Sequence, residues 1–296
     1  MILEGEKMIQ IITDSASDIV EKEAKEMGIE VLPLKVNFDG TEFLDGKTIS
    51  HHEFYEKLIE TDVMPTTSQI PPAEFEEAFR KAVSEGKEVV CITLSQKLSG
   101  CYQSAVIAKN DILDDMPGAK IAVIDSENAC LGQRVLIELA IRLKDEGTSF
   151  DEITGTLETM KKRVRLVALI ETLEYLIKGG RLSKGVGLVA EILSIKPVIA
   201  VEGGEVVVLG KARGSKNANN KLNEIVEKSG GIDFSLPVYL AYSGLSTALL
   251  EKYISDSSKL FEEYVSKNDL PYSCIGATIG THVGPGAIGV AFFAKK

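Results

Sequence analysis

The chain has 296 residues, of which 44% are hydrophobic and 26% are charged, and its formal net charge is −11. This composition predicts a soluble globular protein of one large domain or two ordinary ones. The acidic balance argues against nucleic-acid binding and against an anionic membrane as the main partner, although a transient membrane contact stays open. No apolar run reaches the roughly 18 residues of a membrane span, and the N-terminal residues lack a signal-peptide pattern.

The cysteines and histidines predict no metal site. None of the four cysteines is part of a CxxC pair, so we expect buried, reduced thiols in a cytoplasmic protein. The adjacent His51 and His52 open a helical pattern and are expected in solvent, which leaves His282 as the histidine of interest. The cysteines are Cys91, Cys101, Cys130 and Cys274.

The first half of the chain alternates strands and helices. Its strands are strongly apolar, which is typical of a parallel sheet covered by helices on both faces, a three-layer α/β/α domain. We place this domain at residues 8–148. Strands are predicted at 8–13, 30–38, 88–94 and 119–125, and helices at 19–28, 50–60, 71–86, from about Gly100, and 131–147.

The second half mixes crossovers with a hairpin, so a second α/β domain with a mixed sheet is predicted at 149–296. The hairpin covers 196–213 and turns at Gly203–Gly204. The chain ends in a strand, a Gly-rich loop that carries His282, and a final strand. Helices are predicted at 149–165, 173–181, 184–193, 215–230 and 246–265, and further strands at 166–171 and 236–243.

Five polar stretches follow strands or precede helices, where α/β proteins bind ligands. Among them, "LSQKLSGCYQS" places Ser99 at the N-cap position of a helix, whose free amides and dipole would favour an anion. Two basic loops, around Arg181 and Arg213, are either solvated surface or contacts for phosphate. The five stretches are 13–18, 66–72, 94–104, 125–128 and 280–289.

A catalytic interpretation of the same residues is a serine hydrolase or acyltransferase. Ser99 would be the nucleophile, His282 the base, and Asp14 or Asp125 the group that orients the base. The surrounding "KLSGC" differs from the GxSxG elbow of hydrolases, which counts against this alternative. Asp14 and Asp18 form a pair of carboxylates that could bind a metal ion. No third acidic residue lies nearby in the sequence to complete such a site, so we predict no metal here.

Seven motifs, in this order, resemble those of the DegV family: "TDSASD", "PTTSQIPP", "LSQKLSGCYQSA", "VIDS", "LEYLIKGGRLS", "LSIKPVI" and "GTHVGPGAIG". The resemblance runs from about Ile9 to Phe293. It implies a two-domain α/β protein that binds a long-chain fatty acid between its domains. It also implies a non-enzymatic role, as the binding subunit (FakB) of bacterial fatty acid kinase, with the kinase as a separate partner and with no further cofactor.

The resemblance also implies site residues. The fatty acid carboxylate would be bound by Thr67, Ser99, the backbone N–H of Gly100 and His282. Arg181 and Arg213 match positions near the head group or the kinase-docking surface. The family usually has Thr after "LSG", where this chain has Cys101, and this difference removes any hydroxyl contact from that position.

Overall fold

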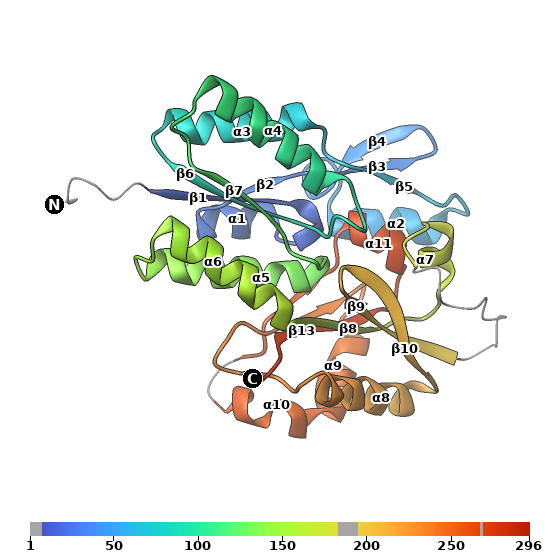
Figure 1. Ribbon diagram of the computed structural model, residues 1–296. Helices are drawn as coiled ribbons and strands as arrows, with labels where there is room; N and C mark the ends of the chain where they lie inside the picture. The colour runs from blue at the N-terminus through green and yellow to red at the C-terminus, as the bar shows by residue number, and fades with distance from the viewer. Residues whose placement is uncertain (1–7, 183–194, 267–268) are drawn as a thin grey trace.

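The computed structural model describes residues 8–182, 195–266 and 269–296. Within them the chain forms three β-sheets, and the two larger ones lie one above the other with helices between and outside them (Figure 1). The predicted α/β architecture, a parallel-sheet domain followed by a domain with a mixed sheet, is therefore confirmed.

The first large sheet has four parallel strands in the order β2-β1-β6-β7. Apolar side chains on both faces of the strands explain the helical layers. Helices α3 and α4 cover one face, and α5 and α6 cover the other, with α1 packed against β2 at the edge. The elements are β1 (Ile9–Asp14), α1 (Glu21–Met27), β2 (Glu30–Leu32), α3 (Pro72–Ser84), β6 (Glu88–Thr93), α4 (Cys101–Asp115), β7 (Ile121–Asp125), α5 (Cys130–Asp145) and α6 (Phe150–Met160).

The second large sheet has six strands in the order β10-β9-β8-β13-β11-β12 and is mixed, because only β11 and β12 run parallel. Helices α8, α9 and α10 cover its outer face, and α5 packs on its inner face (Figure 1). The elements are β8 (Val164–Leu169), β9 (Ile195–Glu202), β10 (Glu205–Arg213), α8 (Ser215–Lys228), β11 (Tyr239–Tyr242), α9 (Ala248–Asp256), α10 (Ser258–Val265), β12 (Tyr272–Cys274) and β13 (Ile288–Phe293).

Helix α5 is shared by both large sheets. It contacts β1 and β6 of the first and β8, β11 and β13 of the second. Its Arg134 is 1% exposed, pairs with Glu23 and Glu138, and stacks on the ring of Tyr239 at 3.9 Å. The long buried run in this helix follows from its place between two sheets, whereas a helix on a single sheet buries one stripe only.

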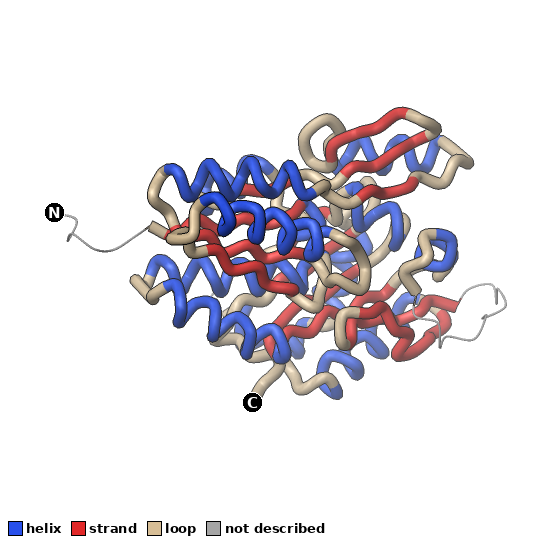
Figure 2. The backbone as a smooth tube through the Cα atoms, turned by 45° about the horizontal axis from the view of Figure 1, so that its top comes forward, coloured by secondary structure: helices blue, strands red, loops and turns tan. Residues whose placement is uncertain are grey.

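A small antiparallel sheet, in the order β4-β3-β5, projects beside the two large ones (Figure 2). It packs on helix α2 through a separate apolar cluster that includes Val36, Phe54 and Tyr55. Strand β5 matters for the site because it carries Thr67, which pairs with Val36 of β3. Its elements are β3 (Lys35–Phe38), β4 (Thr41–Leu44), α2 (His51–Glu60) and β5 (Thr66–Ser68).

Several predicted elements differ from the structure. The strand expected at 30–38 is two strands, β2 and β3, in different sheets, because the chain breaks at Pro33. The helix expected at 246–265 is divided at Ser257 into α9 and α10. The Gly-rich segment expected as a loop contains helix α11 (Ala277–Val283), and the short helix at 173–181 is α7 (Glu174–Lys178). The helix predicted at 184–193 lies outside the described residues.

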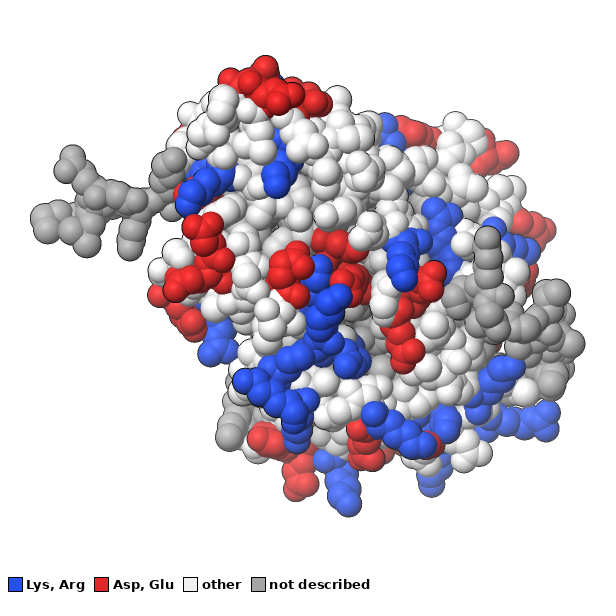
Figure 3. All heavy atoms as spheres, viewed as in Figure 1, with Lys and Arg blue, Asp and Glu red and all other residues white. Residues whose placement is uncertain are grey.

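The division of the chain at 148/149 stays a prediction. Helix α6, which follows it directly, packs on α5 and on β6 and β7 of the first sheet. No helix within the described residues is long and apolar enough to cross a membrane. On the face drawn in Figure 3, basic side chains lie next to acidic ones, in keeping with the many surface ion pairs.

Candidate functional site

A cavity of about 410 Å³ lies between the two large sheets. The carboxyl ends of β6 and β7 lead into one wall, the six-stranded sheet forms another, and α11 closes a side. Ligand sites of parallel sheets lie at these strand ends. Most of the wall is apolar. The apolar side chains that line it include Leu94, Leu98, Leu166, Ala168, Ile199, Val201, Val206, Ile275 and Ile279.

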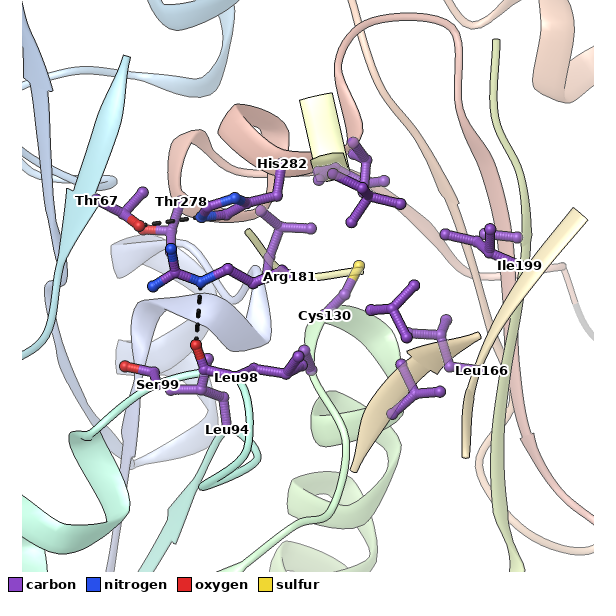
Figure 4. A pocket seen from close by; sticks show the side chains of 18 of the residues that line it. Thr67, Leu94, Leu98, Ser99, Cys130, Leu166, Arg181, Ile199, Thr278 and His282 are labelled. Carbon is purple, nitrogen blue, oxygen red and sulfur yellow. Dashed lines mark hydrogen bonds between the residues drawn. The ribbon is translucent and has the colours of Figure 1, made fainter. Parts of the chain in front are cut away.

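The polar groups of the lining gather at one end of the cavity (Figure 4). Thr67 comes from β5, Ser99 and Gly100 from the turn that leads into α4, and His282 from α11. Thr67 Oγ1 lies 3.0 Å from Nε2 of His282, a hydrogen bond between residues 215 positions apart. The structure therefore places in the lining of one cavity the four residues that the family resemblance implies as carboxylate donors.

The start of α4 differs from the prediction by one residue. Gly100 is the N-cap residue and provides no side-chain cap, so Ser99 precedes the cap and does not fill it. The first N–H groups of a helix have no acceptor within it, and no side chain caps those of α4. A Cβ at Gly100 would overlap the amide of Gln69, so the packing at this position admits only glycine without a shift. Ser99 Oγ donates instead to Sγ of Cys101 at 3.4 Å.

Arg181 also reaches the polar end of the cavity. Its Nε donates to the carbonyl of Leu98 at 3.2 Å and its Nη1 to that of Gly179 at 2.7 Å. Two carbonyl oxygens orient the guanidinium but leave its charge unneutralised, and no described carboxylate pairs with it. Arg213, the other predicted basic residue, is exposed at the end of β10 and does not line the cavity.

His282 lies in the last turn of α11, not in a loop as the sequence suggested. Burial and the positive charge of Arg181 lower the pKa of its imidazole to about 4, so the ring is neutral at pH 7. Its Nδ1 is buried without a hydrogen-bond partner, and a Cβ at Gly179 would collide with this atom. The histidine is thus a neutral hydrogen-bonding group whose orientation is set by close packing.

Two carboxylates from the first half of the chain anchor α11, and the sequence analysis did not assign them this role. Asp18 Oδ1 accepts the N–H of Gly276 at 2.9 Å. Asp45 accepts the N–H groups of Ala277 at 3.0 Å and Thr278 at 3.2 Å. Burial raises the pKa of Asp18 to about 7. Asp18 belongs to the polar motif "TDSASD", which the sequence analysis singled out. The sequence around Asp45 is that of an ordinary turn and gives no sign of this role.

A hydrolase arrangement is not formed. Ser99 and His282 share no hydrogen bond, and the histidine nitrogen that an acid would orient has no partner. Asp14 accepts from the N–H groups of Leu94 and Ala16, while Asp125 accepts from Gln96 and from its own turn. No group of three metal-binding side chains occurs within the described parts of the chain.

From the family resemblance, two apolar segments, residues 166–177 and 187–195, are predicted to line the pocket. Residues 166–177 contribute Leu166, Ala168 and Leu176 to the wall. The second segment, 187–195, lies almost entirely outside the described residues. On the floor, Ala168 of β8 is paired with Gly289 of β13, so small residues leave room above this part of the sheet.

Sequence comparison decides the family. Residues 8–295 match the family model described as "Uncharacterised protein, DegV family". The chain belongs to the DegV family. A DegV domain-containing protein of Caldanaerobacter subterraneus subsp. tengcongensis is 39% identical over 288 residues, which are 97% of this chain and 99% of that protein.

Solved structures of similar DegV proteins share the fold. A fatty acid (stearic acid)-binding protein from Eubacterium ventriosum is 28% identical, with a TM-score of 0.86 over 96% of this chain and 97% of that one. A DegV family protein from Thermus thermophilus, described by its fatty acid binding, is 28% identical, with a TM-score of 0.81 over 97% and 100% of the two chains.

Proposed function

We propose that this protein binds a long-chain fatty acid in the cavity between its two large sheets. The observation that carries the proposal is the division of the cavity into a long apolar wall and one polar end. That end combines an unneutralised guanidinium with hydroxyl and amide donors. The similar protein from Eubacterium ventriosum, which binds stearic acid, supports the same ligand class here.

The carboxylate would accept from Thr67, Ser99 and the N–H of Gly100, with His282 beside Thr67 and the charge of Arg181 opposite. Hydrogen bonds to a charged group contribute about 1.5–3 kcal/mol each. The tail contributes more in total, because about 14 methylenes at roughly 0.8 kcal/mol each give on the order of 11 kcal/mol before the cost of association. The tail therefore sets affinity, and the polar end sets register and selects an acid.

The ligand class is tested by releasing lipids from the purified, denatured protein and identifying them by mass spectrometry. A long-chain fatty acid in near-stoichiometric amount is expected. A lipid without a carboxylate, or no lipid even after incubation with stearate, would contradict the proposal. Ala168→Phe provides a matched control, because its added ring would fill the apolar part of the cavity and leave the polar end intact.

We further propose that the bound acid is presented to a separate, cytoplasmic fatty acid kinase and that this chain performs no chemistry itself. Exposure of Ser68 and Gln69, which border the polar end, is consistent with a carboxylate near the surface. Purified protein loaded with stearate should form acyl phosphate only when kinase and ATP are added.

Two variants test separately whether the chain docks on a kinase and whether it acts as a hydrolase. If exposed Arg213 contributes to kinase docking, Arg213→Glu should lower the phosphorylation rate while stearate affinity stays constant. The hydrolase alternative predicts that a fluorophosphonate labels the protein and that Ser99→Ala abolishes this labelling. We expect no labelling, because Ser99 and His282 are not hydrogen-bonded.

A further inference from the structure

Cys101 contacts both segments that carry the proposed carboxylate donors. It is the first residue of α4, is completely buried, and does not line the cavity. Its Sγ accepts the backbone N–H of Ile70 at 3.5 Å and the hydroxyl of Ser99 at 3.4 Å. The sulfur thus joins the segment after β5 to the start of α4.

These two segments need such a link. Thr67 belongs to the small sheet and Ser99 to the loop after β6, so no shared element fixes the distance between them. Besides the sulfur contacts, a hydrogen bond of 3.1 Å joins Gln69 Nε2 to Ser104 Oγ. Cys101 therefore contributes two of these three hydrogen bonds, in addition to the apolar cluster that the segments share.

The chemistry of a thiol suits this place. Burial raises the pKa of Cys101 to about 12, so the sulfur stays protonated and neutral. Sulfur is a weak hydrogen-bond acceptor. It can orient the hydroxyl of Ser99 without binding its proton strongly, and a carboxylate, being charged, is a much better acceptor for that proton.

We propose that Cys101 is a positioning residue of the carboxylate site. Its sulfur holds the Ser99 oxygen beside the cavity, and when the Ser99 hydroxyl turns its proton to a carboxylate, the protonated thiol donates its own hydrogen to Oγ. This inference rests on the proposed fatty acid function. It predicts that position 101 affects the preference for an acid over an alcohol of equal chain length, although its side chain does not reach the ligand.

The test compares the affinities for stearate and stearyl alcohol in four proteins: wild type, Cys101→Ala, Cys91→Ala and Ser99→Ala. Cys91 is a matched control, because it is equally buried in the same apolar cluster but makes no hydrogen bond with Ser99. Loss of one orienting bond should lower the acid-to-alcohol preference of Cys101→Ala about two- to tenfold. Cys91→Ala should keep the wild-type preference, whatever its loss of stability.

Two further proteins make the result decisive. In the Ser99→Ala background, Cys101→Ala should leave the remaining preference unchanged, because its effect passes through Ser99. If Cys101→Ala does not fold, Cys101→Val keeps the volume and removes the acceptor. An unchanged preference in the Cys101 variant, an equal loss in Cys91→Ala, or additive losses in the double variant would overturn the proposal. Failure of the wild type to bind stearate would instead contradict the proposed function itself.

Discussion

Replacing Arg181 by Met removes the one formal charge among the described residues that line the cavity. The substitution keeps a long apolar stem but deletes a guanidinium that donates to the carbonyls of Leu98 and Gly179. Two effects follow: the carboxylate loses a charged donor, and the protein loses two hydrogen bonds to its own backbone. Only the first effect depends on the ligand's charge.

The size of the charge effect follows from the surroundings of Arg181. A hydrogen bond to a charged group is worth about 1.5–3 kcal/mol, which corresponds to roughly 10- to 150-fold in affinity. Arg181 is only half-buried, so solvent screens part of this interaction. We therefore expect stearate affinity to fall about 10- to 30-fold, the lower part of that range, while stearyl alcohol affinity changes little.

The assay measures retention of radiolabelled stearate and stearyl alcohol by delipidated protein, so that each variant gives a ratio of the two affinities. Arg165→Met is a matched control, because Arg165 also donates to two backbone carbonyls but does not line the cavity. The affinity ratio of Arg181→Lys should lie between those of wild type and Arg181→Met, because lysine keeps the charge but lacks the planar guanidinium with its paired donors. An unchanged ratio in Arg181→Met would refute a carboxylate bound at this end.

Three further predictions concern α11, the buried acids and the tail. Asp45→Ala leaves two buried N–H groups of α11 without acceptors and should lower the free energy of unfolding by about 2–5 kcal/mol, measured in urea. Because burial raises the pKa of Asp18 from 3.8 to about 7, the contribution of this residue to stability is fully present below 3.8 and is lost as the pH rises through about 7. The difference in free energy of unfolding between wild type and Asp18→Asn should therefore shrink from about pH 5 to about pH 7.5. Ala168→Phe should weaken stearate binding more than laurate binding, measured by competition.

Much of the fold could be predicted because its elements carry strong local patterns. The buried strands β6 and β7 are continuous apolar runs, and α3 has a proline at its start and apolar residues at helical spacing. The hairpin of β9 and β10 turns at the predicted Gly203–Gly204. These patterns depend only on neighbours in the sequence, so the elements that they predict are also found in the folded protein.

Helix α11 could not be predicted because its stability comes from distant residues. Its N-terminal N–H groups are bound by Asp18 and Asp45, more than 230 positions earlier in the chain. Its Gly280 packs so closely on Phe54 and Tyr55 that a Cβ there would collide with both rings. In the sequence alone, Gly280 indicates a loop. In the folded protein it lies in a helix, where contacts with distant residues leave no space for a side chain.

The candidate site combines a part that the sequence could identify with a part that only the fold creates. Motif order predicts Thr67, Ser99, Gly100 and His282 as carboxylate donors, whereas the residues taken by themselves left Ser99 open as a nucleophile. The fold separates these two roles, because His282 is neutral, bonded to Thr67, and has no acid at Nδ1. A base needs an orienting partner and a pKa near neutrality. With neither in place, the geometry favours a site in which one charge and several neutral donors bind an anion reversibly.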